Sequence, residues 1–143
     1  MLPVNSSFMN HILEEHAEIS GVLQFMQDNI NHKEILKQKL IELKHFGHNH
    51  LKFEEREVYT KYPLNRIDDE IMINRLLNEH QEIQNQVRQI VFDIKKERTP
   101  RLHLLTQVIE RHHKLENEFL YPALDAFLSD ETKAQLLKKA KNR

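Results

Sequence analysis

The sequence has no cysteine, and only 2 glycines and 4 prolines among its 143 residues. Without cysteine, the chain cannot form a disulfide, a thiolate-ligated zinc site or an iron–sulfur cluster. Residues that break helices are scarce, and the apolar residues are spaced three and four apart. This pattern predicts an all-α fold. A chain without cysteine also fits a reducing compartment such as the cytoplasm.

The sequence also lacks an excess of charge of one sign and a long apolar run. Its 21 Lys and Arg residues are balanced by 22 Asp and Glu residues, so it has no basic footprint for nucleic acid. No stretch approaches the roughly 18 consecutive apolar residues of a membrane-spanning helix. Met1 to Ser7 has no basic segment followed by an apolar run. We therefore expect a soluble, cytoplasmic protein that binds neither nucleic acid nor a membrane.

The sequence does contain a short pattern that occurs twice. The segment Leu13 to Ile19 (LEEHAEI) recurs as Leu77 to Ile83 (LNEHQEI). Each copy is followed downstream by a His-x-x-x-Glu pair and then a tyrosine: His50, Glu54 and Tyr59 in the first half, His112, Glu116 and Tyr121 in the second. The repetition predicts two similar helical hairpins related by an approximate twofold axis.

The apolar spacing predicts four helices joined by short loops. The first begins near Ser6 or Ser7, either of which is a good N-cap, and ends near 29–31. The second runs from about residue 32 to Pro63, whose ring cannot continue a helix. The third begins at 68–70, where three acids suit the positive end of the helix dipole.

The fourth helix is predicted to follow Thr99, as N-cap, and Pro100, as first helical residue. Pro122 should perturb its end, and Ser129 is a candidate start for a short C-terminal helix. Short connections favour neighbouring helices that run in opposite directions. We therefore expect residues 1–143 to form a single domain, an antiparallel up-down-up-down four-helix bundle with this short C-terminal helix as an addition.

Four histidines and two glutamates lie on the predicted inward faces of four helices: His16, His50, Glu54, His80, His112 and Glu116. Unpaired ionisable groups are unfavourable in a core, whereas a divalent cation stabilises neutral imidazole beside ionised carboxylate. This donor set suits iron, manganese or zinc better than calcium or magnesium. A single histidine of this kind is more often a hydrogen-bonded core residue than a metal ligand. A single His-x-x-x-Glu motif is more often an exposed helical pair. The duplicated pattern favours a two-metal centre.

The segments EEHAEI, HLKFEE, NEHQEI and HHKLENEFLYP, which hold these six residues, resemble those of the hemerythrin-like HHE cation-binding domain family. The resemblance covers almost the whole chain. It implies an antiparallel four-helix bundle with two non-haem iron ions, with or without an oxo or hydroxo bridge, and with manganese or zinc as second choices. It implies these ligands: His16 and His50 on one iron, His80 and His112 on the other, and Glu54 and Glu116 bridging.

The resemblance further implies a protein that binds or senses a small diatomic ligand, oxygen or nitric oxide. The alternative is an enzyme that reduces nitric oxide or peroxide, or that repairs iron centres. Oxygen-carrying members have another histidine where this chain has Gln84, and their last carboxylate where it has Asn117. A centre with one imidazole fewer would be more symmetric, which argues against reversible oxygen transport.

Other residues near these motifs have weaker signals. Glu55 and Glu118 flank the candidate ligands, and either could orient a ligand or be solvated. We expect Tyr59 and Tyr121 to pack at helix ends, and His113 to be a surface imidazole. The sequence shows no Ser/His/Asp arrangement and no glycine-rich phosphate loop, which disfavours nucleophilic and phosphoryl-transfer chemistry.

Overall fold

The computed structural model describes residues 6–143, and its regular secondary structure within that range is entirely helical. The predicted all-α class is therefore confirmed. Our expectation of a cytoplasmic location rests in part on Met1 to Ser7, and residues 1–5 of that segment lie outside the described range. Among the described residues, no helix is long and apolar enough to cross a membrane.

The first half of the chain, residues 7–61, consists of two helical rods. The first rod is α1 (Ser7–Asp28), and the Ser6 side chain caps it by accepting a hydrogen bond from the Met9 amide at 3.1 Å. The second rod is continuous but changes its winding several times. Its parts are α2 (Lys33–His45), the π-helical turn η1 (Phe46–His50), α3 (Leu51–Phe53), the π-helical turn η2 (Glu54–Val58) and the 3₁₀ turn η3 (Tyr59–Lys61).

The second half, residues 67–127, repeats this plan. It begins with α4 (Ile67–Lys95), and its second rod consists of α5 (His103–Leu115), the π-helical turn η4 (Glu116–Leu120) and α6 (Tyr121–Phe127). The predicted start at Thr99 and Pro100 is wrong, because α5 begins three residues after the proline. Pro100 and Leu102 are both buried, so the chain is anchored to the core before the helix starts.

The sequence predicts that Pro122 perturbs the end of the second rod, but the rod continues past it. Pro122 lies near the start of α6, directly after η4, and the helix continues to Phe127. A π-helical turn already departs from the regular hydrogen-bond ladder, so a residue without an N–H is tolerated there. The short helix predicted after Ser129 is confirmed as α7 (Asp130–Lys141), capped by the Ser129 hydroxyl, which accepts from the Thr132 amide.

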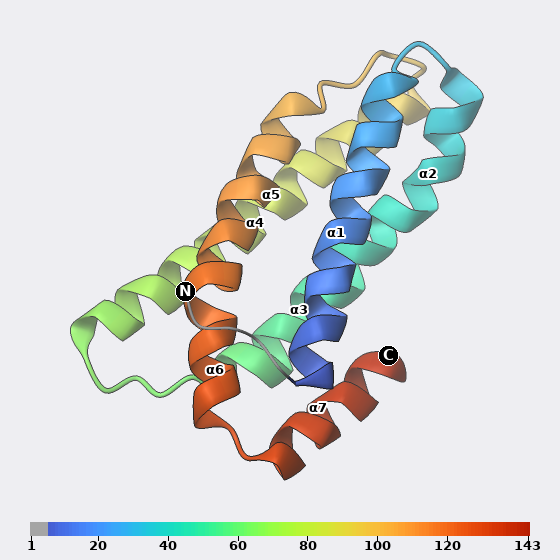
Figure 1. Cartoon of the computed structure of the whole chain (residues 1–143). Coiled ribbons are helices and arrows are strands. Elements are labelled where there is room, and N and C mark those ends of the chain that lie inside the picture. The colour runs from blue at the N-terminus through green and yellow to red at the C-terminus, as the bar shows by residue number, and fades with distance from the viewer. Residues whose placement is uncertain (1–5) are drawn as a thin grey trace.

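The helices pack as a bundle (Figure 1). α1 contacts α2 and α5, and α4 likewise contacts α2 and α5, so each half touches the other along two helix pairs. The C-terminal α7 packs against α1 and lies across the end of the bundle where α1 begins. The rods that carry the repeated motifs therefore surround one interior.

The interior holds two apolar clusters separated by a polar layer. On α1, Ile12 belongs to one cluster and Ile19 to the other, and His16 lies between them. His80 interrupts the apolar stripe of α4 at the corresponding level. Hydrophobic packing on both sides therefore fixes the rods that carry the polar side chains and keeps bulk water away from them.

Candidate metal centre

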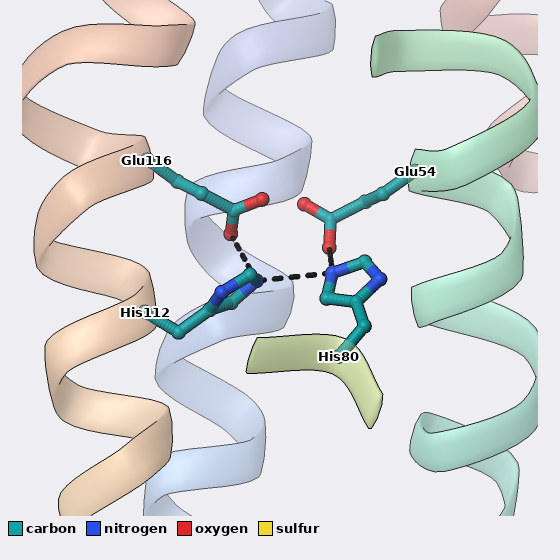
Figure 2. Close-up of side chains that lie close together, drawn as sticks. All are labelled: Glu54, His80, His112 and Glu116. Atoms are coloured by element: carbon teal, nitrogen blue, oxygen red, sulfur yellow. Dashed lines mark hydrogen bonds and ion pairs between the residues drawn. The ribbon is translucent and has the colours of Figure 1, made fainter. Parts of the chain in front are cut away.

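The structure brings the six predicted site residues together in the polar layer. None of them is more than 3% exposed, and they come from four rods: His16 on α1, His50 on η1, Glu54 on η2, His80 on α4, His112 on α5 and Glu116 on η4. Figure 2 shows four of them, with the two carboxylates facing each other above the two imidazoles. The three residues from the His-x-x-x-Glu motifs that begin or end a π-helical turn are His50, Glu54 and Glu116. π-helical turns are frequent at functional sites.

Each glutamate lies between imidazoles of both halves. Glu54 Oε1 is 3.3 Å from His50 Nε2 in its own half and 3.3 Å from His80 Nε2 in the other. Glu116 Oε1 is 3.3 Å from His112 Nε2 in its own half, and also from the Nε2 atom of the α1 histidine in the other. The two carboxylates thus occupy equivalent positions between the halves of the molecule.

The ligand atoms fall into groups that are compact enough to hold a cation. One group consists of Glu54, His80, His112 and Glu116, and another of His16, His50 and Glu54. Within each group, the nitrogen and oxygen atoms lie within 4.8 Å of one another. The groups share a glutamate, and they separate the four histidines into the same two pairs that the family resemblance implies.

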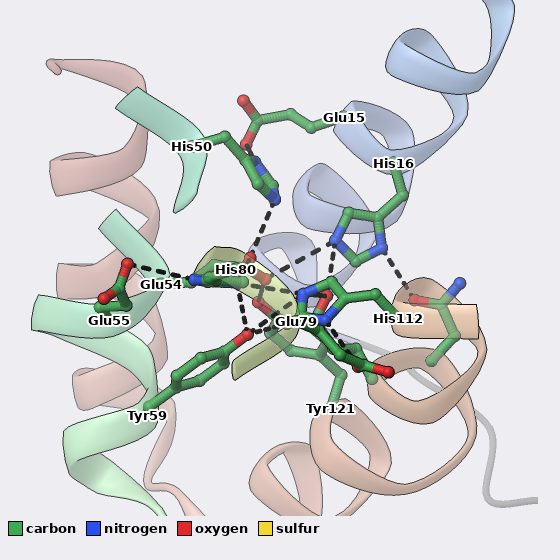
Figure 3. Close-up of polar contacts among 12 residues, drawn as sticks. Glu15, His16, His50, Glu54, Glu55, Tyr59, Glu79, His80, His112 and Tyr121 are labelled. Atoms are coloured by element: carbon green, nitrogen blue, oxygen red, sulfur yellow. Dashed lines mark hydrogen bonds and ion pairs between the residues drawn. The ribbon is translucent and has the colours of Figure 1, made fainter. Parts of the chain in front are cut away.

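The Nδ1 atom of each of these imidazoles faces an oxygen acceptor, while Nε2 faces the centre (Figure 3). Three of these contacts are within hydrogen-bond distance: His16 with Asn117 Oδ1 at 2.9 Å, His80 with Glu55 Oε2 at 3.1 Å and His112 with Glu79 Oε1 at 3.0 Å. The fourth, His50 with Glu15 Oε1 at 3.6 Å, is an ion-pair contact, and neither of its two atoms has a hydrogen-bond partner among the described residues. An acceptor at Nδ1 favours the tautomer whose Nε2 lone pair is free for a cation, which is how metal-ligating histidines are usually supported.

These acceptors also follow the repeat. Glu15 and Glu79 directly precede the lone histidines, and each contacts the other histidine of its own half. Glu55 and Asn117 directly follow the two central glutamates, and each contacts a lone histidine of the other half. Glu118, which had seemed equivalent to Glu55, is exposed. Our sequence reasoning missed Glu15 and Glu79, although both occupy the same place in the repeated segment.

The two tyrosines cross between the halves. Tyr59 Oη donates to Glu116 Oε2 at 2.5 Å, and Tyr121 Oη donates to Glu54 Oε2 at 2.5 Å. Burial, reinforced by the nearby carboxylates, raises the pKa of both phenols, so both keep the proton that they donate. Their predicted role as packing residues is therefore incomplete, because they also hold the carboxylates in place.

The charges of the centre are mutually dependent in the metal-free chain. Burial lowers the pKa of His50 and of His112, but adjacent carboxylates outweigh it and raise these pKa values to about 9 and about 10. Burial acts in the opposite sense on Glu54, but the surrounding imidazoles hold its pKa well below the usual range. The carboxylate charge is thus retained in the interior only because cationic groups surround it.

A divalent cation fits this donor set. Several buried atoms at the centre have no hydrogen-bond partner in the described residues: His16 Nε2, His50 Nε2, Glu54 Oε1 and Glu116 Oε1. A native core leaves few such atoms unpaired, and those that remain often belong to a functional site. Imidazole nitrogens with carboxylate oxygens match iron, manganese and zinc. The centre can therefore bind a metal cation.

One residue lies elsewhere than the sequence suggested. His113 is not a surface imidazole but is 6% exposed, and its ring stacks on that of His16 at a centroid distance of 3.8 Å and an interplanar angle of 8°. Burial lowers its pKa, with the neighbouring histidine adding to the effect. Gln84 lines an open groove beside Gly47 and Val87.

The comparison with protein families agrees with the geometry. The family described as hemerythrin HHE cation binding domain matches residues 7–124, a range that includes the whole polar layer and ends before α7. No curated protein and no solved structure matches the chain. The resemblance inferred from the sequence motifs is thus confirmed at the level of the family.

Proposed function

Because the chain belongs to the hemerythrin HHE cation-binding domain family, we propose that it holds two non-haem iron ions and binds oxygen or nitric oxide there. The proposed ligands are His16 and His50 for one ion, His80 and His112 for the other, and Glu54 and Glu116 for both. The observation that carries this proposal is the shared orientation of the four imidazoles. All direct Nε2 inward and Nδ1 towards an oxygen acceptor.

The side chains around the centre would set its properties. Bound ferrous ions supply electrons and open coordination positions to a small ligand. Tyr59 and Tyr121 each hold one oxygen of a central carboxylate, which leaves the other oxygen directed at the imidazoles. The two apolar clusters exclude bulk water, and a dry surrounding strengthens every electrostatic contact within the layer.

The proposal includes the finer arrangement of the bundle and its surroundings. We infer that the four rods run alternately up and down, since short connections join consecutive rods that contact each other. We also propose that the protein acts in the cytoplasm, where its lack of cysteine and a supply of ferrous iron are compatible.

Metal analysis tests the proposal directly. Protein purified anaerobically without chelator should contain about two irons per chain, and the ferrous form should bind nitric oxide with a new visible absorption band. Glu54→Ala should lose most of the iron, because it removes an oxygen ligand from both positions. The exposed imidazole on α5 provides a matched control, since His103→Ala should retain wild-type iron.

Stably folded wild-type protein that takes up no iron would refute the metal centre. Iron-loaded protein that binds neither nitric oxide nor oxygen would refute the ligand-binding function while leaving the centre intact. Consumption of nitric oxide or peroxide far beyond one equivalent per centre would identify an enzyme instead.

A further inference from the structure

His113 is a buried imidazole in the polar layer that the proposed ligand set does not use. Its Nε2 atom is fully buried and has no hydrogen-bond partner among the described residues. It belongs with His16 and Glu116 to a third group whose nitrogen and oxygen atoms lie within 4.8 Å of one another. An unpaired polar nitrogen in a core is unfavourable, because nothing compensates for its lost hydration. The presence of this imidazole beside the candidate metal centre suggests that Nε2 has a hydrogen-bond partner from outside the protein chain.

The ring geometry argues against His113 as a further ligand of the same ion. A metal bound to imidazole lies close to the ring plane, about 2.0–2.1 Å from the nitrogen. The rings of His113 and His16 are nearly parallel, at 8°, with centroids 3.8 Å apart. One ion cannot lie in both planes at that distance. His113 therefore lies about one ring thickness from the plane in which His16 would hold an ion.

His113 is held firmly in this position. One face stacks on His16, and Phe46 approaches its ring edge-on, with centroids 6.3 Å apart and an interplanar angle of 85°. The same Phe46 stacks on His50 at a centroid distance of 5.0 Å. The three imidazoles on this side of the layer therefore form a rigid wall. The Nε2 atoms of His16 and His50 are assigned to the proposed ion, whereas the unpaired Nε2 atom of His113 has no such partner assigned.

A groove brings solvent close to this wall. It lies between α1 and α2, has a volume of about 650 Å³ and is lined by Phe46, His50 and Glu15, among others. Gly21, which lies on α1 like Glu15, also lines this groove and leaves open space where another residue would place a side chain. A small ligand that enters here reaches the aromatic ring that separates the groove from His113.

We propose that Nε2–H of His113 donates a hydrogen bond to a small ligand, such as oxygen, nitric oxide or azide, held at the ion on the His16 and His50 side. This inference rests on the proposed function. It assigns His113 a binding role distinct from metal ligation. It also makes the two metal positions unequal, since position 113 has no histidine counterpart in the first half: the residue after His50 is Leu51.

Azide binding to the oxidised, iron-loaded protein provides the test, with iron content measured in parallel. His113→Leu replaces the imidazole with an apolar side chain of similar size and so removes the N–H donor. It should retain two irons per chain and bind azide about tenfold or more weakly, as expected for a lost hydrogen bond to a charged group. His113→Gln, which retains an N–H donor, should recover part of the affinity. The exposed His103→Gln on the same helix should bind azide as wild type does.

Each other result overturns the inference. Loss of iron in His113→Leu would identify His113 as a metal ligand, and unchanged azide affinity with full iron would show that Nε2 serves only a water molecule. Wild-type protein that binds iron but neither azide, nitric oxide nor oxygen would refute the proposed function itself. Failure of the proposed function is seen in the wild-type protein, whereas failure of this inference is seen only in the His113→Leu variant. The two failures are therefore distinguishable.

Discussion

At the scale of single residues, the oxygen acceptors at the Nδ1 atoms fix the orientation of the four central imidazoles. The side chain of Glu79 is only 5% exposed. One of its oxygens lies within hydrogen-bond distance of His112 Nδ1, and the other accepts a hydrogen bond from Arg111 Nε at 2.9 Å. The arginine keeps this carboxylate charged and oriented, and the carboxylate in turn orients the ring. A change at Glu79 therefore acts on the metal without removing any ligand.

We predict that Glu79→Ala lowers metal affinity by about 10- to 100-fold, the usual effect of losing such a partner. Competition with a chromophoric chelator measures this affinity. Glu82→Ala is the matched control, because Glu82 lies on the same helix and pairs with the same Arg111 at 3.1 Å, but does not contact any of the four central imidazoles. Equal affinities for the two variants would contradict the supporting role of Glu79.

The charge state of two imidazoles gives a pH dependence to the metal-free protein. The folded chain raises the pKa of His50 to about 9 and that of His112 to about 10, from an ordinary 6.5. Protonation thus stabilises the fold fully below about pH 6.5, and this contribution is lost as the pH rises through 9 to 10, at about 1.4 kcal/mol per unit of pKa shift.

We therefore expect the free energy of unfolding of chelator-treated protein to fall between pH 6.5 and pH 9.5. Urea denaturation at several pH values measures it. His32→Gln, at an exposed position, should show the same slope as wild type. A free energy that stays constant or rises over this range would contradict the assigned imidazole charges.

The residue types and their spacing were enough to predict the six central side chains, because a buried polar group on an apolar stripe is conspicuous in sequence. The acceptors were harder to predict. Glu15 and Glu79 lie next to helix positions rich in surface charge, and only their equivalence in the repeat distinguished them. The burial of His113 depends on the α1 to α5 packing, which no local pattern encodes.

At the scale of elements, α7 extends the bundle beyond the range matched by the family. Leu136 and Ala140 are buried in the apolar cluster at the start of α1. Arg143 pairs with Glu15, the acceptor behind His50, and its guanidinium lies 4.7 Å from the centre of the Phe53 ring. The C-terminal helix is thus connected to the metal centre through one carboxylate.

We predict that Leu136→Ala destabilises the protein by about 2–4 kcal/mol, because it leaves a cavity in the cluster that α7 shares with α1. Chemical denaturation measures this change. The neighbouring Leu137→Ala is the control, and it should have a smaller effect because Leu137 is only partly buried. Similar effects of the two substitutions would show that α7 does not pack as described.

The errors in predicted helix ends share a cause. The sequence signals at Thr99 and Pro122 are local, whereas the observed boundaries depend on tertiary packing and on the winding of the rod. Leu102 is buried in the core directly before α5, and the helix begins only after it. The π-helical turn η4 accommodates the proline. Where no such competition exists, as at Ser6 and Ser129, the capping signals predicted the helix starts correctly.

At the scale of the whole molecule, the metal should be a major source of stability. Its ligands come from four rods, and in its absence several buried atoms lack partners. A ligand present at about 1,000 times its Kd adds about 4 kcal/mol to the free energy of unfolding. For a chain of this length, such a change corresponds to roughly 10 °C in Tm.

We predict that chelation lowers Tm by roughly this amount and that added ferrous iron restores it under anaerobic conditions. Differential scanning calorimetry measures both changes. Glu54→Ala should have a Tm that chelator barely alters, because it lacks a shared ligand. If chelator left the wild-type Tm unchanged, the bundle would be independent of its centre.

The crossed tyrosine–glutamate contacts have a consequence for assembly. Since Tyr59 donates to Glu116 and Tyr121 donates to Glu54, neither half of the chain contains both a central carboxylate and the tyrosine that holds it. The full set of side chains around the proposed centre therefore comes together only after the second half has been synthesised and has docked. We expect the proposed metal to be bound in its final form late in folding, where it would stabilise the contact between the two halves.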